Sequence, residues 1–221
     1  MAKEKKRLPQ VLAVIATSVM AARDIVVSLL QQILGDAASD EYAVTSVDAS
    51  ETGPEELRPH LTGRSLLAED RVVVVSSAEA WTAAQQREIL PMLRALPPGL
   101  SVILTVVGEQ AERSQPFQAD LTTFLKSHGH IERHRKLAAR DAQPWVGSAA
   151  QRLGVQMDDA AAAELVDRVG PDEDRLASEM EKLATYAGDS GRITLEAVRE
   201  LVPRSLEASV FVLIDALSSG D

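Results

Sequence analysis

Histidine is the first residue type in this chain whose spacing could do chemistry. His128, His130 and His134 lie close together, and imidazole is a common metal ligand. The chain has no cysteine, which excludes disulfides, zinc ribbons and thiol nucleophiles. No set of carboxylates is arranged to orient the three rings as ligands. We therefore expect the histidines to lie on a loop-and-strand surface, and we predict no metal site.

Acidic pairs and adjacent serines could serve in acid–base or nucleophilic catalysis. The acidic groups Asp158-Asp159 and Asp172-Glu173-Asp174 stand where helices are expected to begin, and carboxylates there cap free backbone amides. The pair Ser76-Ser77 lacks the surrounding pattern of a nucleophile elbow. We predict no catalytic residue from either set.

Phosphate chemistry would need a glycine-rich loop followed by Lys and Ser or Thr. None of the 12 glycines precedes a lysine, and the first apolar run continues into TSVMAARD. An ATPase also needs acidic residues after a second hydrophobic strand, but Val72–Val75 leads into SSAEA, where we expect Glu79 to be a surface residue. The sequence predicts a degenerate nucleotide site without hydrolysis or cofactor, at Thr17, Ser18, Ser76 and Ser77.

Strand-like and helix-like segments alternate through the first two-thirds of the chain, which predicts an α/β fold. Helical periodicity over Thr82–Ala95 ends at Pro97-Pro98-Gly99. Runs that are apolar on both faces indicate a parallel sheet covered by helices. The five expected strands are Leu12–Ala16, Ala43–Val47, Val72–Val75, Val102–Val107 and a short segment near Ile131–His134.

The remainder of the chain is expected to be all-helical. Helices are predicted at Asp141–Leu153 with Pro144 in the first turn, at Asp158–Val169 with an Asp cap, at Asp172–Ala187, and from the Thr194 cap to Pro203. We place one domain at 1–137 and a helical domain at 138–206. The apolar segment 207–221 needs a partner surface, and we expect it to begin a further domain that has been cut away.

Charge and hydropathy restrict location and partners. The net charge of −10 argues against strong duplex binding by this chain alone. A basic start followed by the apolar run Val11–Ala22 imitates a signal peptide. Thr17 and Ser18 interrupt that run, and a second apolar series, Ile25–Leu34, follows it. No apolar stretch reaches bilayer length, so we predict a cytoplasmic protein without a membrane partner.

Two adjacent leucines precede the valine strand and could bind a partner. Leu66 and Leu67 lie in a polar, Gly-containing connection between Ser65 and Ala68. Neighbouring residues of a helix or strand point in different directions, so they cannot both face one core. One reading has both leucines covering the sheet and a helix end, and the other has them projecting as a hydrophobic plug. Periodicity leaves both readings open.

Four segments together resemble the delta subunit of the bacterial DNA polymerase III clamp loader, an AAA+-like protein. They are RVVVV, ALPPGLSVILTVV, PWVGSAAQRLGVQMDDAAAAELVDRVG with Trp145 at a characteristic position, and GPDEDRLASEMEKLATYAGDSGRITLEAVRELVPRSLEASVFVLIDAL. The similarity covers about residue 55 to 221. It implies an AAA+-like parallel five-stranded sheet at 1–137, a lid domain at 138–206, and the start of a truncated collar domain at 207–221.

The resemblance also implies a function for the adjacent leucines. In the delta family this connection inserts two bulky apolar residues into the sliding clamp, and the matching residues are Leu66 and Leu67, flanked by Ser65 and Ala68. The implied role is to bind the clamp and open it for loading onto primed DNA. The other clamp-loader subunits would hydrolyse ATP, and DNA would be contacted only within the assembled complex. The chain would be a non-catalytic subunit of a polymerase holoenzyme.

Two alternatives remain open at this stage. The chain could be a divergent AAA+ ATPase that binds nucleotide through unrecognised residues near Thr17 and Ser18. It could also be a helical adaptor of a DNA-repair or replication complex, with the α/β domain serving only as a platform.

Overall fold

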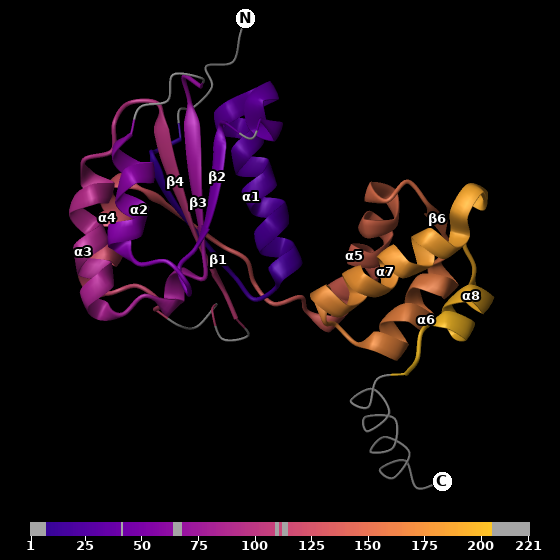
Figure 1. The fold of residues 1–221 in the computed structure, drawn as a ribbon. Helices are drawn as coiled ribbons and strands as arrows, with labels where there is room; N and C mark the ends of the chain where they lie inside the picture. The colour runs from indigo at the N-terminus through magenta and orange to yellow at the C-terminus, as the bar shows by residue number, and fades with distance from the viewer. Residues whose placement is uncertain (1–7, 41, 64–67, 109–110, 112–114, 205–221) are drawn as a thin grey trace, which may run out of the picture. The chain divides into compact units, whose positions relative to one another are not determined.

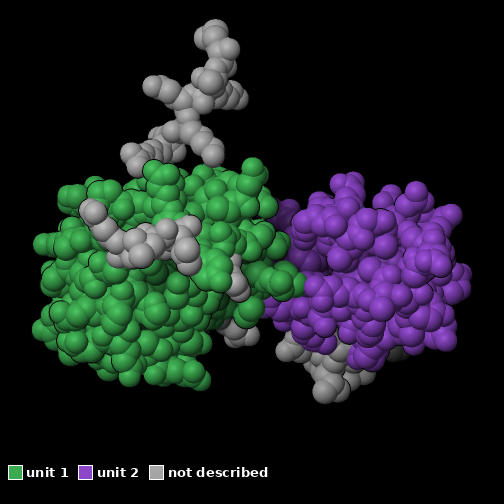
Figure 2. Space-filling model, turned by 45° about the horizontal axis from the view of Figure 1, so that its top comes forward, with its two compact units in different colours: residues 1–136 green, residues 137–221 purple. Residues whose placement is uncertain are grey.

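A computed structural model of the chain describes residues 8–40, 42–63, 68–108, 111 and 115–204 (Figure 1). The chain divides into two compact units, residues 1–136 and 137–221, which Figure 2 colours separately. Within the described residues, no helix combines the length and the apolar character needed to cross a bilayer.

Unit 1 is built on a five-stranded parallel sheet in the order β2-β3-β4-β1-β5 (Figure 1). In the register of the central pair, Leu12 is opposite Ile103 and Val14 is opposite Thr105. Every pairing in this sheet is parallel, so helices must carry the chain back between strands. The strands are β1 (Val11–Ala16), β2 (Val44–Asp48), β3 (Arg71–Ser76), β4 (Leu100–Val107) and β5 (His130–Arg133).

Helices cover both faces of this sheet because the central strands are apolar on both faces. Alternate residues of β1 belong to different cores: Ala13 and Ile15 pack with α2, α3 and α4, whereas Leu12 and Val14 pack with α1. The helices are α1 (Val19–Leu34), α2 (Pro54–Thr62), α3 (Ala83–Arg94) and α4 (Ala119–His128), with short 3₁₀ turns at Gly35–Ser39 and Ala78–Ala80. The predicted α/β class is confirmed.

The described part of unit 2, residues 137–204, forms a bundle of four helices around one core. Asp172 caps α7 by accepting a hydrogen bond from the Arg175 amide, and Thr194 caps α8 in the same way from Ala197, as their sequence positions predict. The helices are α5 (Ala139–Arg152), α6 (Asp159–Val169), α7 (Glu173–Ala187) and α8 (Leu195–Leu201), and a short 3₁₀ turn spans Gly188–Ser190.

Three local predictions for unit 2 are wrong. Two short strands, β6 (Gln156–Met157) and β7 (Arg192–Ile193), pair in parallel where no strand was expected. Helix α5 begins at Ala139, so Pro144 lies inside the helix rather than in its first turn. The Asp158 side chain makes no cap bond, because it accepts two hydrogen bonds from Arg192 at 3.0 and 3.1 Å.

Candidate functional site

The connection predicted to bind a partner runs from the end of α2 to the start of β3. Ser65, Leu66 and Leu67 lie outside the described residues, whereas Ala68 is described and half-buried. Hydrogen bonds fix the described residues at both ends of the connection, which we call its stems. The Gly63 amide bonds to the Pro59 carbonyl at 3.1 Å, and the Arg71 guanidinium donates to the Gly63 carbonyl.

The stem on the β3 side is pressed against the turn before β4. Gly99 has φ +81°, and a β-carbon there would approach the Glu69 carbonyl oxygen to 2.5 Å. The Arg71 amide bonds to the Gly99 carbonyl at 2.7 Å. Two cavities open beside this contact, of about 180 and 590 Å³, and both are lined by Pro98 and Leu100. The described residues on both sides of the connection are therefore fixed at the amino edge of the sheet.

The predicted degenerate nucleotide site lies at the opposite, carboxyl edge of the sheet. Thr17 and Ser18 follow β1, and Ser76 and Ser77 follow the last valine of β3. Strand β4 separates β1 from β3, so the two pairs share one edge at a spacing of roughly 10 Å, two strand widths.

The hydroxyl of Ser18 and those of Ser76 and Ser77 have different partners at this edge. Ser18 is buried and accepts a hydrogen bond from the Ala21 amide at 3.0 Å, which caps α1. Ser76 donates to the Val47 carbonyl at 3.3 Å, toward β2. Ser77 has a left-handed backbone with φ 54°, unlike any other described residue except glycine. Ser76 and Ser77 both interact with the Asp48 carboxyl, whereas Ser18 caps α1, so the two pairs of predicted residues have separate polar surroundings.

Two carboxylates, Asp48 and Glu79, lie near the same edge, and Glu79 is exposed as its sequence position predicts. Asp48 is the register partner of Ser76. Hydrogen bonds from the hydroxyl and amide of Ser50 hold the pKa of the Asp48 carboxyl below its ordinary value. Partial burial raises the pKa of the Glu79 carboxyl, and the negative charge of Asp48 adds to that increase. Asp48 directly follows the predicted strand Ala43–Val47. This position is the sequence feature that could have placed it at the carboxyl edge.

The histidines form no converging set. His128 ends α4, where its ring stacks on Phe124 at 5.6 Å between centroids and its Nδ1 lies 2.7 Å from the Ser127 hydroxyl. His130 begins the edge strand β5, and His134 lies just beyond its end. In the part of the chain that the structure describes, no three residues among His, Asp and Glu are placed to share a metal ion.

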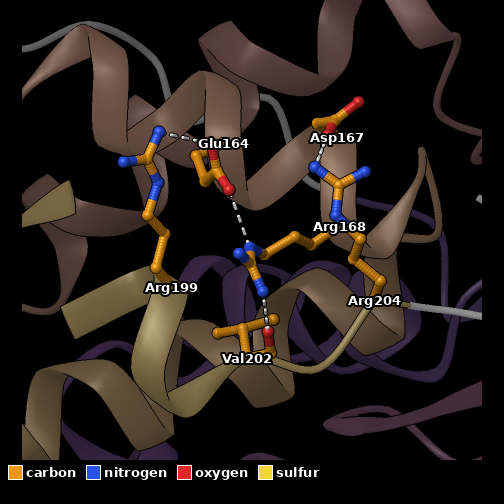
Figure 3. A network of polar contacts seen from close by, with 6 residues as sticks. All are labelled: Glu164, Asp167, Arg168, Arg199, Val202 and Arg204. Carbon is orange, nitrogen blue, oxygen red and sulfur yellow. Dashed lines mark hydrogen bonds and ion pairs between the residues drawn. The ribbon is translucent and has the colours of Figure 1, made fainter. Parts of the chain in front are cut away.

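In unit 2 a polar network fixes the chain where it leaves α8 (Figure 3). Arg168 bonds to the Glu164 carboxylate at 2.9 Å and to the Val202 carbonyl at 2.8 Å. Arg199 approaches Glu164 at 3.5 Å, and Arg204 pairs with Asp167 at 3.0 Å. The hydrogen bond from Arg168 lowers the pKa of the Glu164 carboxyl, and Arg199 contributes further.

Trp145 has a structural place in unit 2. Its indole N–H donates to the Glu173 carboxylate at 3.0 Å, and the Arg152 guanidinium lies 5.6 Å from the ring centroid. The side chain thereby joins α5 to the first turn of α7, the helix near the start of the fourth resembling segment.

Solved structures of known proteins define the fold class of this chain. No family model matches the chain. The Holliday junction branch migration motor RuvB of Thermotoga maritima aligns with TM-score 0.53 at 14% identity, over 87% of this chain and 60% of that one. Domain III of the replication initiation protein DnaA from Thermotoga maritima aligns with TM-score 0.54 at 12% identity, over 90% of this chain and 85% of that one. The fold is AAA+-like.

One curated protein and one solved structure similar to this chain are delta subunits. DNA polymerase III subunit delta of Bacillus subtilis (strain 168) is 26% identical over 200 residues, or 86% of this chain. The solved Bacillus subtilis clamp loader delta protein YqeN aligns with TM-score 0.55 at 22% identity, over 96% of this chain and 64% of that one. The chain spans 56% of the length of the curated relative. The predicted resemblance to the delta subunit is confirmed.

Replacing Gly99 with alanine tests whether the base of the connection is held by close backbone contact. We expect Gly99→Ala to lower the free energy of unfolding of unit 1 by roughly 1–3 kcal/mol, because the positive φ is strained for alanine and its β-carbon meets the Glu69 carbonyl. Urea denaturation measures the change. Gly147→Ala in α5 is the control, because nothing lies within 4 Å and alanine should stabilise that helix. Wild-type stability of Gly99→Ala would contradict the contact.

Replacing Glu164 with glutamine tests the network of unit 2. A carboxyl whose pKa is lowered by folding stabilises the protein above its unfolded pKa, and that contribution disappears as pH falls through the folded pKa. We expect Glu164→Gln to unfold at a lower temperature than wild type at neutral pH. The difference should shrink as both proteins are acidified below the ordinary Glu pKa of about 4.3. Thermal unfolding followed by circular dichroism measures both.

Glu181→Gln on the exposed face of α7 is the charge-matched control for this experiment. A difference between Glu164→Gln and wild type that is constant from neutral to acidic pH would show that the ion pair with Arg168 is not its source.

Proposed function

We propose that this chain acts in a replicative clamp loader as a delta-type subunit. It binds the sliding clamp and opens it for loading onto primed DNA, and it leaves ATP hydrolysis to other subunits. The observation that carries the proposal is the 26% identity to subunit delta over 86% of the chain. The proposed division of labour gives clamp binding to domain 1–137, a lid role to 138–206 and the start of a collar to 207–221.

The clamp would be bound through Leu66 and Leu67, with Ser65 and Ala68 beside them. The fixed stems at Gly63 and Arg71 support this assignment, because a short connection with fixed ends loses less conformational freedom on binding. Burial of two leucines contributes about 3–6 kcal/mol before the costs of association, which is enough for a hot spot.

The absence of hydrolysis is supported by the carboxyl edge of the sheet. The Ser18 side chain satisfies an α1 amide that a phosphate could otherwise approach at the helix N-terminus. No glycine in the chain is directly followed by lysine, so the usual cation of a phosphate loop is missing. Thr17, Ser18, Ser76 and Ser77 remain as the proposed remnants of the site.

Clamp opening would follow from differential affinity. A ligand shifts an equilibrium between closed and open rings only to the extent that it binds one state more tightly. The proposal therefore requires that the surface around the leucines fits an open clamp interface better than a closed one. Primed DNA and the remaining subunits would be met within the assembled complex.

Double replacement of the two leucines tests the proposal. Leu66→Ala plus Leu67→Ala should weaken capture of a sliding clamp by roughly 100-fold or more, the equivalent of losing about 3 kcal/mol of apolar burial. Pull-down or surface plasmon resonance with purified clamp measures the loss, and circular dichroism checks that the variant is folded. Leu153→Ala, which removes a leucine that is 41% exposed in unit 2, should bind like wild type.

Unchanged capture by the folded double variant would remove the leucines from the interface. ATP binding at micromolar concentration that disappears with Ser18→Ala would instead favour the divergent ATPase, the competing class. Clamp capture that survives deletion of residues 138–221 would argue against the helical adaptor.

A further inference from the structure

Two cationic side chains from different elements line one small cavity in unit 1. Lys126 lies on α4 and Arg133 ends β5, and both are exposed. The cavity measures about 40 Å³. At 10–15 Å³ for each water-sized atom, it has room for about three oxygens, which suits the free oxygens of one phosphoryl group.

Part-buried hydrogen bonds fix the segment from Pro116 to Thr122, which also lines the cavity. Gln86, only 3% exposed, donates to the Pro116 carbonyl at 3.1 Å and accepts from the Gln118 amide at 2.7 Å. The Thr122 hydroxyl donates to the Phe117 carbonyl at 3.0 Å. The segment that lines the cavity is therefore held before any ligand arrives, which reduces the entropic cost of binding.

The charge of the cavity is not balanced by the described residues that line it. None of them is Asp or Glu. Glu132 neighbours Arg133 on β5, and successive side chains of a strand point to opposite faces. The Arg133 guanidinium donates a long hydrogen bond, 3.4 Å, to the Ala111 carbonyl.

Positive charge continues along the chain beyond the cavity. Arg135 and Lys136 are both exposed, so four Lys or Arg residues fall between 126 and 136 in a protein of net charge −10. This local excess has the sign that attracts phosphate. A single free phosphate would use only the cavity, whereas a nucleic-acid strand would use the cavity and the cations after it.

We propose that the cavity between Lys126 and Arg133 binds a phosphate of a DNA strand, and that Arg135 extends the contact to the strand's backbone. The inference rests on the proposed function in its choice of DNA as the polyanion. It adds a local site to the expectation that DNA is contacted within the assembled complex. The contact is made to the backbone, so it carries no base specificity.

Binding of a fluorescently labelled single-stranded oligonucleotide at low salt tests the inference. We expect Lys126→Gln plus Arg133→Gln to weaken binding by about tenfold or more, since each lost bond involves a charged group. The slope of log affinity against log salt should become shallower by roughly 0.7, from the loss of one phosphate contact. Arg58→Gln plus Arg87→Gln is the matched control, because it removes the same charge from exposed positions on α2 and α3.

Three results would overturn the inference. The first is an equal loss of binding in the control, which would reflect net charge alone. The second is no oligonucleotide binding by the wild-type chain. The third is inorganic phosphate that perturbs the NMR signals around Lys126 while the oligonucleotide does not bind, which would assign the cavity to a free anion.

The two proposals can fail separately. Clamp capture should be unchanged in Lys126→Gln plus Arg133→Gln, and oligonucleotide binding should be unchanged in Leu66→Ala plus Leu67→Ala. A loss of oligonucleotide binding in the leucine variant would contradict the phosphate site without bearing on clamp capture.

Discussion

The fold of unit 1 depends on burying both faces of its parallel sheet. The central strands carry apolar side chains on each face, so water must be excluded from both sides. Parallel pairing also requires that every connection returns across the sheet. The turns therefore collect at the sheet's two ends, the carboxyl edge and the amino edge. Each end can change its chemistry without disturbing the apolar layers between them.

The two edges differ in how their polar groups are used. At the carboxyl edge, Ser18 caps its own helix through the Ala21 amide and Ser76 bonds to the Val47 carbonyl of the neighbouring strand. At the amino edge, the connection after α2 is fixed at its stems by Arg71 and Gly99. A chain without a phosphate loop can thus keep the whole layered architecture, because that loop is not part of the hydrophobic core.

Hydrophobic periodicity predicted the long buried strands and helices. It did not predict features that depend on very short strands or on polar contacts between residues far apart in the sequence. The run Val72–Val75 could be recognised as a strand because it is continuous and apolar. Strands β6 and β7 have two residues each, too few for any period. Asp158 looked like a helix cap, but Arg192, 34 residues away, takes its carboxylate.

Strand β5 is an edge strand whose outer side pairs with no described strand. Such an edge can recruit a strand from another molecule, and charged side chains are a common protection against this. His130, Glu132 and Arg133 provide that protection within a strand of four residues. Arg133 would then protect the strand edge against aggregation in addition to its proposed role in binding phosphate. Selection against aggregation could therefore preserve a basic residue here even in a homologue that no longer meets a polyanion.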